Sequence, residues 1–371
     1  MPLPSHPHPD SDLDPIPPGP AHYAEQALLG ALLLDPDQLP QSAQLLPAHF
    51  ANASHAAVYA ALRTLTPPGP EAHAQAPLWL NPVLATAVTA APALTASYLH
   101  TLISSCPRAQ HAGAYARMVR AEHARRTLRR HAQRLAQTVT DPTLPHPVAV
   151  VLRQADVLAR HLDELAAQFT PHPGSLPRTP QPAPPAPDGS QAALDEERLF
   201  LATATAHPHT LQNLRWLQPE DFAEPLHGQL YRCLTALAHR GDPVDPVTVL
   251  WEAQHRGLLA TGLTPAGLLA LTSTPVGSPE HWAEQILQRA LLTGAHTTAT
   301  RIHTFTEDPA NTPHQLITGA RRALGEFTAL RQRWHRAQGN PPAAAPPPGH
   351  TPTALPVRTR PALQTKPRSL R

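Results

Sequence analysis

Apolar residues recur with helical spacing along this chain, most regularly near the end of each half. Residues 148–169 and 316–334 carry apolar side chains three and four positions apart, which places them along one side of a helix. Such heptad spacing predicts a seam that packs along another helix. The candidate interaction seam consists of Ala155, Leu158, Leu162, Leu165, Phe169, Ala323, Phe327, Leu330 and Trp334.

Each seam follows a proline-containing turn and another long helical segment, so each pair of segments predicts a helical hairpin. The expected arms are residues 112–139 with 147–169, and residues 279–305 with 312–334. Thr312 and Gln315 have the spacing of a capping box, with proline at the first helical position. The pattern leaves three arrangements open. Each seam packs on its own domain, the two hairpins pair with each other, or they pair with another subunit.

A five-residue signature occurs twice, 172 residues apart, ahead of these hairpins. It consists of Phe50, His55, Tyr59, Leu62 and Leu65, and again of Phe222, His227, Tyr231, Leu234 and Leu237. Within each copy the tyrosine and leucines lie on one face of a helix. Ser54 is the expected N-cap of the first helix and Pro225 a first-turn residue of the second. Identical residues at identical spacing indicate that one helical module has been duplicated.

An acidic residue precedes a short apolar helix in each copy, at Glu25 and, displaced by 171, at Glu196. We expect His55 and His227 to bond a backbone group and orient the chain entering each signature helix. No nucleophile or carboxylate is predicted to accompany both histidines. Packing is therefore favoured over catalysis, and no catalytic residue is assigned.

Composition leaves room for two domains joined by proline-rich connections. The 48 prolines gather near the N-terminus, in the middle and near the C-terminus, where such composition favours disorder. We predict a disordered leader, a first domain, a disordered linker, a second domain and a disordered basic tail, at residues 1–20, 21–169, 170–194, 195–335 and 336–371.

Charge, cysteine content and histidine spacing argue against several classes of protein. The formal net charge is +2 and the two cysteines are too few for a disulfide scaffold, which fits a cytoplasmic protein. No uninterrupted apolar run is long enough to predict a membrane span. The 24 histidines form no helix-face pair and no cysteine motif accompanies them, so neither a metal nor a cofactor is predicted.

Arginines supply the one candidate surface for nucleic acid. A cluster in the first hairpin includes Arg125, Arg126, Arg129 and Arg130, and the tail carries Arg358 and Arg360 without any acidic residue. Basic segments of this kind hold phosphates in a salt-dependent manner. A solvated helix face and an inert solubilising tail are the alternative interpretations.

The order of these features resembles the N-terminal domain of the DnaB-type replicative DNA helicase. The resemblance rests on the acidic residue before an apolar helix, the Pro-x-x-Phe step, the His-x3-Tyr pair and the stretch 241–249 of the second copy. It covers roughly residues 22–169 and 195–334. The first copy departs from the pattern at residues 66–80, a proline-rich insertion, after which only residues 81–83 match.

That resemblance implies an all-α fold in which each copy is a small helical bundle followed by a hairpin, with hairpins pairing between subunits. It also implies a collar on the helicase ring where the primase docks. The family's ATPase motor requires a Gly-x4-Gly-Lys-Ser/Thr loop, because its lysine reaches the nucleotide phosphates. Lys366 is the only lysine here, and proline follows it with no glycine before it. We therefore expect a protein that does not unwind DNA by itself.

The leading hypothesis is a non-catalytic replication accessory that binds the replicative helicase, its loader or the primase, and that self-associates through its hairpins. The alternative is a nucleic-acid-binding regulatory protein that uses the arginine-rich helix and the tail. A subunit that borrows a partner's motor and a decayed helicase remnant also remain open.

Overall fold

The computed structural model describes residues 19–76, 78–170, 174–182, 189–261 and 263–339. Every regular element in these ranges is a helix, so the predicted all-α class is confirmed. The calls on the leader and on most of the tail fall outside the described residues. In the described part of the chain, no helix combines the length and apolarity that a membrane crossing requires.

Each half begins with a small bundle of short helices. The first bundle contains α1 (Pro20–Leu34), α2 (Ala53–Thr64), α3 (Pro70–Gln75), α4 (Leu80–Ala87) and α5 (Ala96–Ser104). The second contains α8 (Gln191–Ala206), α9 (Pro225–Arg240), α10 (Pro246–His255) and α11 (Pro265–Leu271). In α1 the side chains of Leu28, Leu29 and Leu32 are all fully buried, so this helix runs through its bundle's core.

Each bundle leads into a long hairpin, close to the predicted limits. The first hairpin is α6 (Ala112–Thr140) and α7 (Pro147–Gln168), and the second is α12 (Pro279–Glu307) and α13 (Pro313–Ala337). The capping box of Thr312 and Gln315 is present, and Pro225 begins α9 as predicted. The N-cap of α2 is Asn52 rather than Ser54, because the Asn52 side chain accepts the amides of Ser54 and His55.

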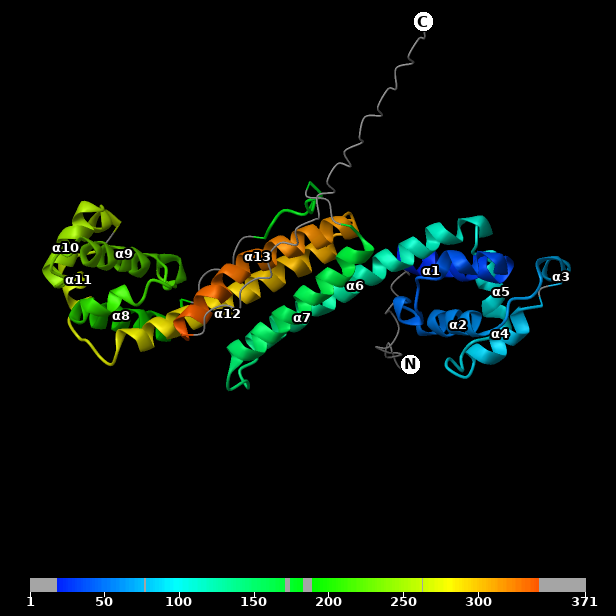
Figure 1. Ribbon diagram of the computed structural model, residues 1–371, viewed down its shortest axis with the longest axis horizontal. Helices are drawn as coiled ribbons and strands as arrows, with labels where there is room; N and C mark the ends of the chain where they lie inside the picture. The colour runs from blue at the N-terminus through cyan, green and yellow to red at the C-terminus, as the bar shows by residue number, and fades with distance from the viewer. Residues whose placement is uncertain (1–18, 77, 171–173, 183–188, 262, 340–371) are drawn as a thin grey trace, which may run out of the picture.

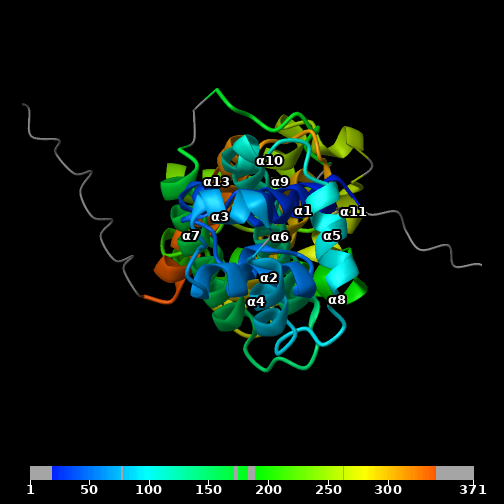
Figure 2. The same ribbon diagram turned by 90° about the vertical axis from the view of Figure 1, so that its right-hand side faces the viewer.

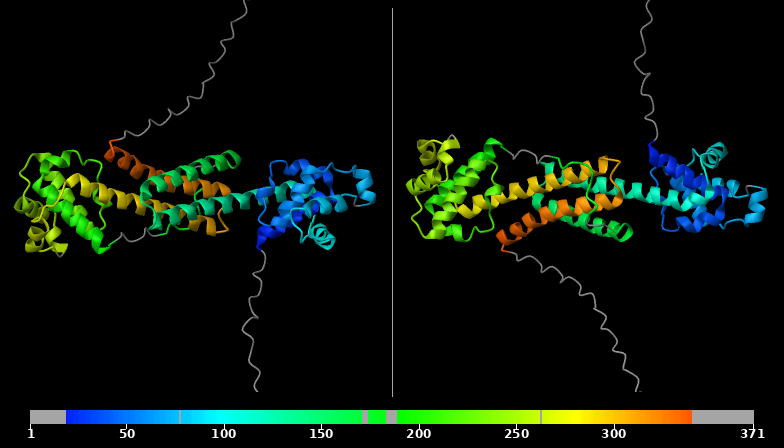
Figure 3. Two further views of the ribbon diagram at one scale, coloured as in Figure 1. Left: turned by 90° about the horizontal axis from the view of Figure 1, so that it is seen from below. Right: turned by 90° about the horizontal axis from the view of Figure 1, so that it is seen from above.

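The molecule is elongated, with one bundle at each end and the two hairpins between them (Figure 1). The long helices α6 and α12 lie side by side along the length of the molecule, as both further views show (Figure 3). Seen along its length, the body is narrow and the helices of the first bundle lie in front of the hairpins (Figure 2). The hairpins therefore form the only described connection in which the two halves pack together.

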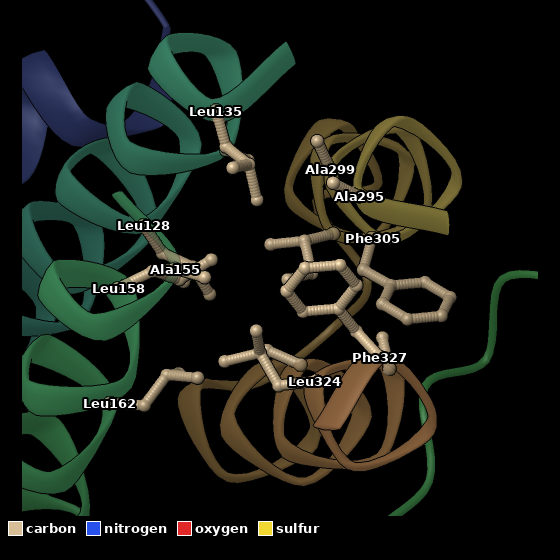
Figure 4. Packing of buried hydrophobic residues seen from close by; sticks show 14 of the residues in the cluster. Leu128, Leu135, Ala155, Leu158, Leu162, Ala295, Ala299, Phe305, Leu324 and Phe327 are labelled. Atoms are coloured by element: carbon tan, nitrogen blue, oxygen red, sulfur yellow. The ribbon is translucent and has the colours of Figure 1, made fainter. Parts of the chain in front are cut away.

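A single hydrophobic cluster unites the four hairpin helices. It includes Leu128 and Leu135 of α6, Leu158 of α7, Ala299 of α12 and Phe327 of α13, all buried. Figure 4 shows these side chains converging between the helices. Of the three arrangements that the sequence left open, the structure shows the second: the hairpins pair with each other.

The described part of the linker lies on the second hairpin. Thr179 donates its hydroxyl to Asp308 Oδ2 at 2.6 Å, and the amide of Arg178 donates to Asn311 Oδ1 at 2.8 Å. Pro177 lies so close to Gly319 of α13 that a Cβ there would approach its ring to 2.4 Å. Residues 174–182 of the predicted linker therefore pack on the second hairpin, because side chains of the α12–α13 turn bind this segment.

Candidate functional site

The repeated histidine forms a buried contact with a carboxylate. In the first copy, His55 Nδ1 lies 2.7 Å from Glu25 Oε2, and both side chains are at most 2% exposed. Glu25 also accepts the backbone amide of Ala51 at 2.6 Å. The carboxylate thus binds the start of the signature helix α2 to α1, across 30 residues of sequence.

The second copy repeats this arrangement with Glu197. His227 Nδ1 lies 2.8 Å from Glu197 Oε2, and the amide of Ala223 donates to Glu197 at 2.6 Å. The equivalent of Glu25 is therefore Glu197, at the same 172-residue displacement as the signature, and not Glu196. The expectation that no carboxylate accompanies both histidines was wrong. The identical 30-residue offset between glutamate and histidine is the signal that would have revealed it.

Burial and hydrogen bonding compete over the ionisation of Glu197. Burial disfavours the charged carboxylate, but hydrogen bonds from His227 and from the amides of Ala223 and Glu224 outweigh it and lower the pKa of Glu197. A carboxylate that accepts several donors is stabilised in its charged form. This cluster therefore has a structural role, which we call the clasp: the charged carboxylate joins the first helix of the bundle to the start of the signature helix.

The remaining signature residues stabilise the same region of each bundle. The Tyr59 hydroxyl donates to the carbonyl of Ser42 at 2.7 Å, and the Tyr231 hydroxyl to that of Leu214 at 3.1 Å. The rings of Phe50 and Tyr59 pack 4.9 Å apart, centroid to centroid. Of the four leucines, Leu62, Leu234 and Leu237 are buried and Leu65 is half-buried. These contacts account for all five residues through folding and assign none of them a reaction.

The seam residues lie inside the central bundle. Ala155, Leu158, Leu162, Leu165 and Phe169 of the first hairpin, with Ala323 and Phe327 of the second, are buried in the shared cluster. Leu330 and Trp334 are partly buried and also contact the core of the second bundle. The seams are therefore occupied within one chain.

The arginine cluster of α6 serves mainly to hold the two hairpins together. Arg125 donates to the carbonyls of Asp308 and Asn311, each at 2.6 Å, at the turn between α12 and α13. Arg129 donates to the carbonyl of Thr306 at 2.6 Å. The carbonyls of Thr306 and Asp308 lie at the C-terminal end of α12, where the helix dipole attracts a cation. We name these contacts of Arg125 and Arg129 the arginine clamp.

The other two arginines of the cluster, Arg126 and Arg130, lie outside the arginine clamp. Arg126 donates to the carbonyl of His49 at 2.8 Å and lies 3.8 Å from Glu25. Arg130 is exposed, while Arg358 and Arg360 lie outside the described residues. The prediction of nucleic-acid contact therefore depends on these last three side chains, since the others bind the protein itself.

Two histidine pairs involve helix α6, one with the first bundle and one with α7. The rings of His49 and His123 lie 4.3 Å apart, and those of His131 and His161 lie 4.6 Å apart. Burial, and then the partner histidine and nearby arginines, lower the pKa of His123 and of His131 to about 4. Both are therefore neutral near pH 7, and sequence reasoning had not singled them out.

Comparison with known proteins agrees with this architecture. Residues 20–121 and 190–288 each match the family model described as the DnaB-like helicase N terminal domain. No solved structure matches the chain. The two matches together cover more than half of its length and correspond to the two bundles with the first part of each long hairpin helix. The chain therefore belongs to the family of DnaB-like helicase N-terminal domains, and it carries that domain twice.

Proposed function

We propose that this protein is a non-catalytic accessory of DNA replication that binds the replicative helicase, its loader or the primase. The observation that carries the proposal is the single hydrophobic cluster built from both hairpins. In the family that the chain resembles, hairpins pair between subunits to build a collar. Here one chain supplies both hairpins, so it presents a preassembled pair of collar modules.

Covalent linkage supports this role energetically. Joining two binding modules converts their association into an intramolecular step with a high effective concentration. The buried Leu128, Leu158, Ala299 and Phe327 leave no large part of the seam unpaired. We therefore expect the chain alone to be a monomer whose remaining surfaces, mainly those of the two end bundles, contact the partner.

A mass measurement tests the proposal. Sedimentation of the purified chain, alone and mixed in turn with purified helicase, loader and primase, should show a monomer and a heavier complex with at least one of them. Leu135→Asp, which places a charge in the shared cluster, should abolish the complex. Gln137→Asp, on the exposed side of the same helix, should not. Unchanged mass with all three partners would refute the proposal.

A further inference from the structure

The two bundles contain equivalent surface pockets, and an arginine of the signature helix lines the first of them but not the second. The pocket of the second copy has a volume of about 510 Å³ and that of the first about 370 Å³. Their walls correspond at the 172-residue displacement, with Leu211 in place of Leu39 and Thr235 in place of Arg63. The duplication thus supplies an internal comparison of one pocket with and without an arginine at this position of the signature helix.

In the first copy, Arg63 binds the backbone that borders the pocket. Its Nη1 donates to the carbonyl of Ala43 at 3.2 Å and to that of Leu45 at 3.1 Å. A guanidinium suits this position because it offers several donors in a fixed plane. The first copy therefore carries its own ligand for these two carbonyls.

The second copy lacks that ligand. Thr235 replaces Arg63, and its hydroxyl donates to the carbonyl of Tyr231 within its own helix at 3.0 Å. The carbonyls of Arg215 and Leu217, which correspond to those of Ala43 and Leu45, accept no hydrogen bond from any described residue. The pocket also extends to Leu217, Pro219 and Tyr231, in keeping with its larger volume.

The C-terminal segment begins close to this pocket. Arg333 of α13 donates to the carbonyl of Trp216, between the two unpaired carbonyls, at 3.3 Å. Helix α13 ends at Ala337 and the described chain at Gly339. Arg358 follows nineteen residues later, a stretch that spans up to about 60 Å when extended.

We propose that the pocket beside α9 binds the guanidinium of Arg358 or of its neighbour Arg360, from the segment 340–371. The bound guanidinium donates to the carbonyls of Arg215 and Leu217, as Arg63 does in the first copy. Because the exposed Arg215 side chain adds positive charge at the rim, salt should strengthen this contact by screening the repulsion. Binding of the tail to nucleic acid would instead weaken with salt.

Trypsin cleavage of the full chain tests the contact. Trypsin cuts after Arg358 and Arg368, whereas proline follows both Arg360 and Lys366, so cleavage after Arg368 is an internal reference. Thr235→Arg supplies the missing guanidinium from within the pocket and should displace the segment. Cleavage after Arg358, relative to Arg368, should then accelerate about tenfold, because proteolysis follows the population of the open form.

Two further variants complete the experiment. Gln229→Arg adds the same charge to an exposed position of α9 outside the pocket and should cleave like the wild type. The double variant R358Q/R360Q leaves the described body unchanged, and hydrogen exchange of residues 211–219 should become faster in it. Equal cleavage ratios in the wild type and Thr235→Arg, or unaltered exchange in R358Q/R360Q, would overturn the proposal.

Discussion

His55 and Glu25 lie 2.7 Å apart in the core of the first bundle, and His227 and Glu197 repeat the contact at 2.8 Å in the second. Each pair joins the first helix of its bundle to the signature helix. The same carboxylates also accept backbone amides ahead of that helix. The duplicated clasp therefore explains why the histidine occurs at the same place in both copies.

Removal of the carboxylate should destabilise the fold strongly. We expect Glu25→Ala to lower the free energy of unfolding by about 3 kcal/mol, because His55 and the amide of Ala51 lose their buried partner. Tyr59→Phe, which removes one hydrogen bond to the Ser42 carbonyl, should cost about 1 kcal/mol. Urea unfolding of the two variants measures both values. Equal losses would contradict a dominant role for the carboxylate.

Acidification should weaken the first hairpin. The pKa of His123 and of His131 is about 4 in the folded protein and about 6.5 in an unfolded chain. The unfolded state therefore binds more protons, and stability falls as the pH drops from about 6.5 to about 4. Unfolding free energies at pH 7.5, 6 and 5 should decline less steeply in the double variant H123Q/H131Q. A decline identical to that of the wild type would contradict the prediction, because it would show that these histidines titrate alike in the folded and unfolded states.

The arginine clamp should contribute measurably to hairpin pairing. Arg125→Ala is expected to lower the free energy of unfolding by about 2 kcal/mol, because charge-assisted hydrogen bonds to several carbonyls are lost. Arg125→Lys should recover only part of this, since an ammonium cannot span the same acceptors. The exposed Arg130→Ala should change stability by no more than about 0.5 kcal/mol. If Arg125→Ala and Arg130→Ala behaved alike, the clamp would have no energetic role.

Two helical glycines should respond to alanine in opposite directions. A Cβ on Gly30 of α1 would lie 2.1 Å from the carbonyl oxygen of Leu102, so Gly30→Ala should cost about 1–3 kcal/mol or more through forced displacement of α5. Gly325 of α13 has no atom within 4 Å of such a Cβ. Gly325→Ala should raise stability by about 0.5–1 kcal/mol, because alanine favours the helix. Thermal unfolding of both variants provides the comparison.

The sequence predicted the helices and the duplication because both depend on local spacing. The limits of α6, α7, α12 and α13 followed closely from apolar periodicity and proline turns. The sequence could not identify the helix against which each seam packs, because an apolar stripe can pack against any complementary helix. Only the three-dimensional arrangement of both hairpins resolves that choice.

The polar contacts were harder to predict for a different reason. Glu197 has an acidic neighbour at Glu196, so the counterpart of Glu25 was predicted one residue too early. The arginines of α6 were interpreted as a solvated or nucleic-acid-binding surface, because helical spacing does not reveal which helix end lies nearby. Arg125 binds carbonyls of the protein itself because the α12–α13 turn lies beside it.

Among the residues that the structure describes, the arginine clamp exists on one side of the paired hairpins only. Helices α6 and α12 have the same length, and the position in α12 that corresponds to Arg125 is Leu292. In two identical chains related by a twofold axis, both equivalent positions would have to carry the same residue. Fusion of the two copies in one chain removes that requirement, so the two ends of the paired hairpins can carry different residues. A partner can then recognise this protein in a single orientation.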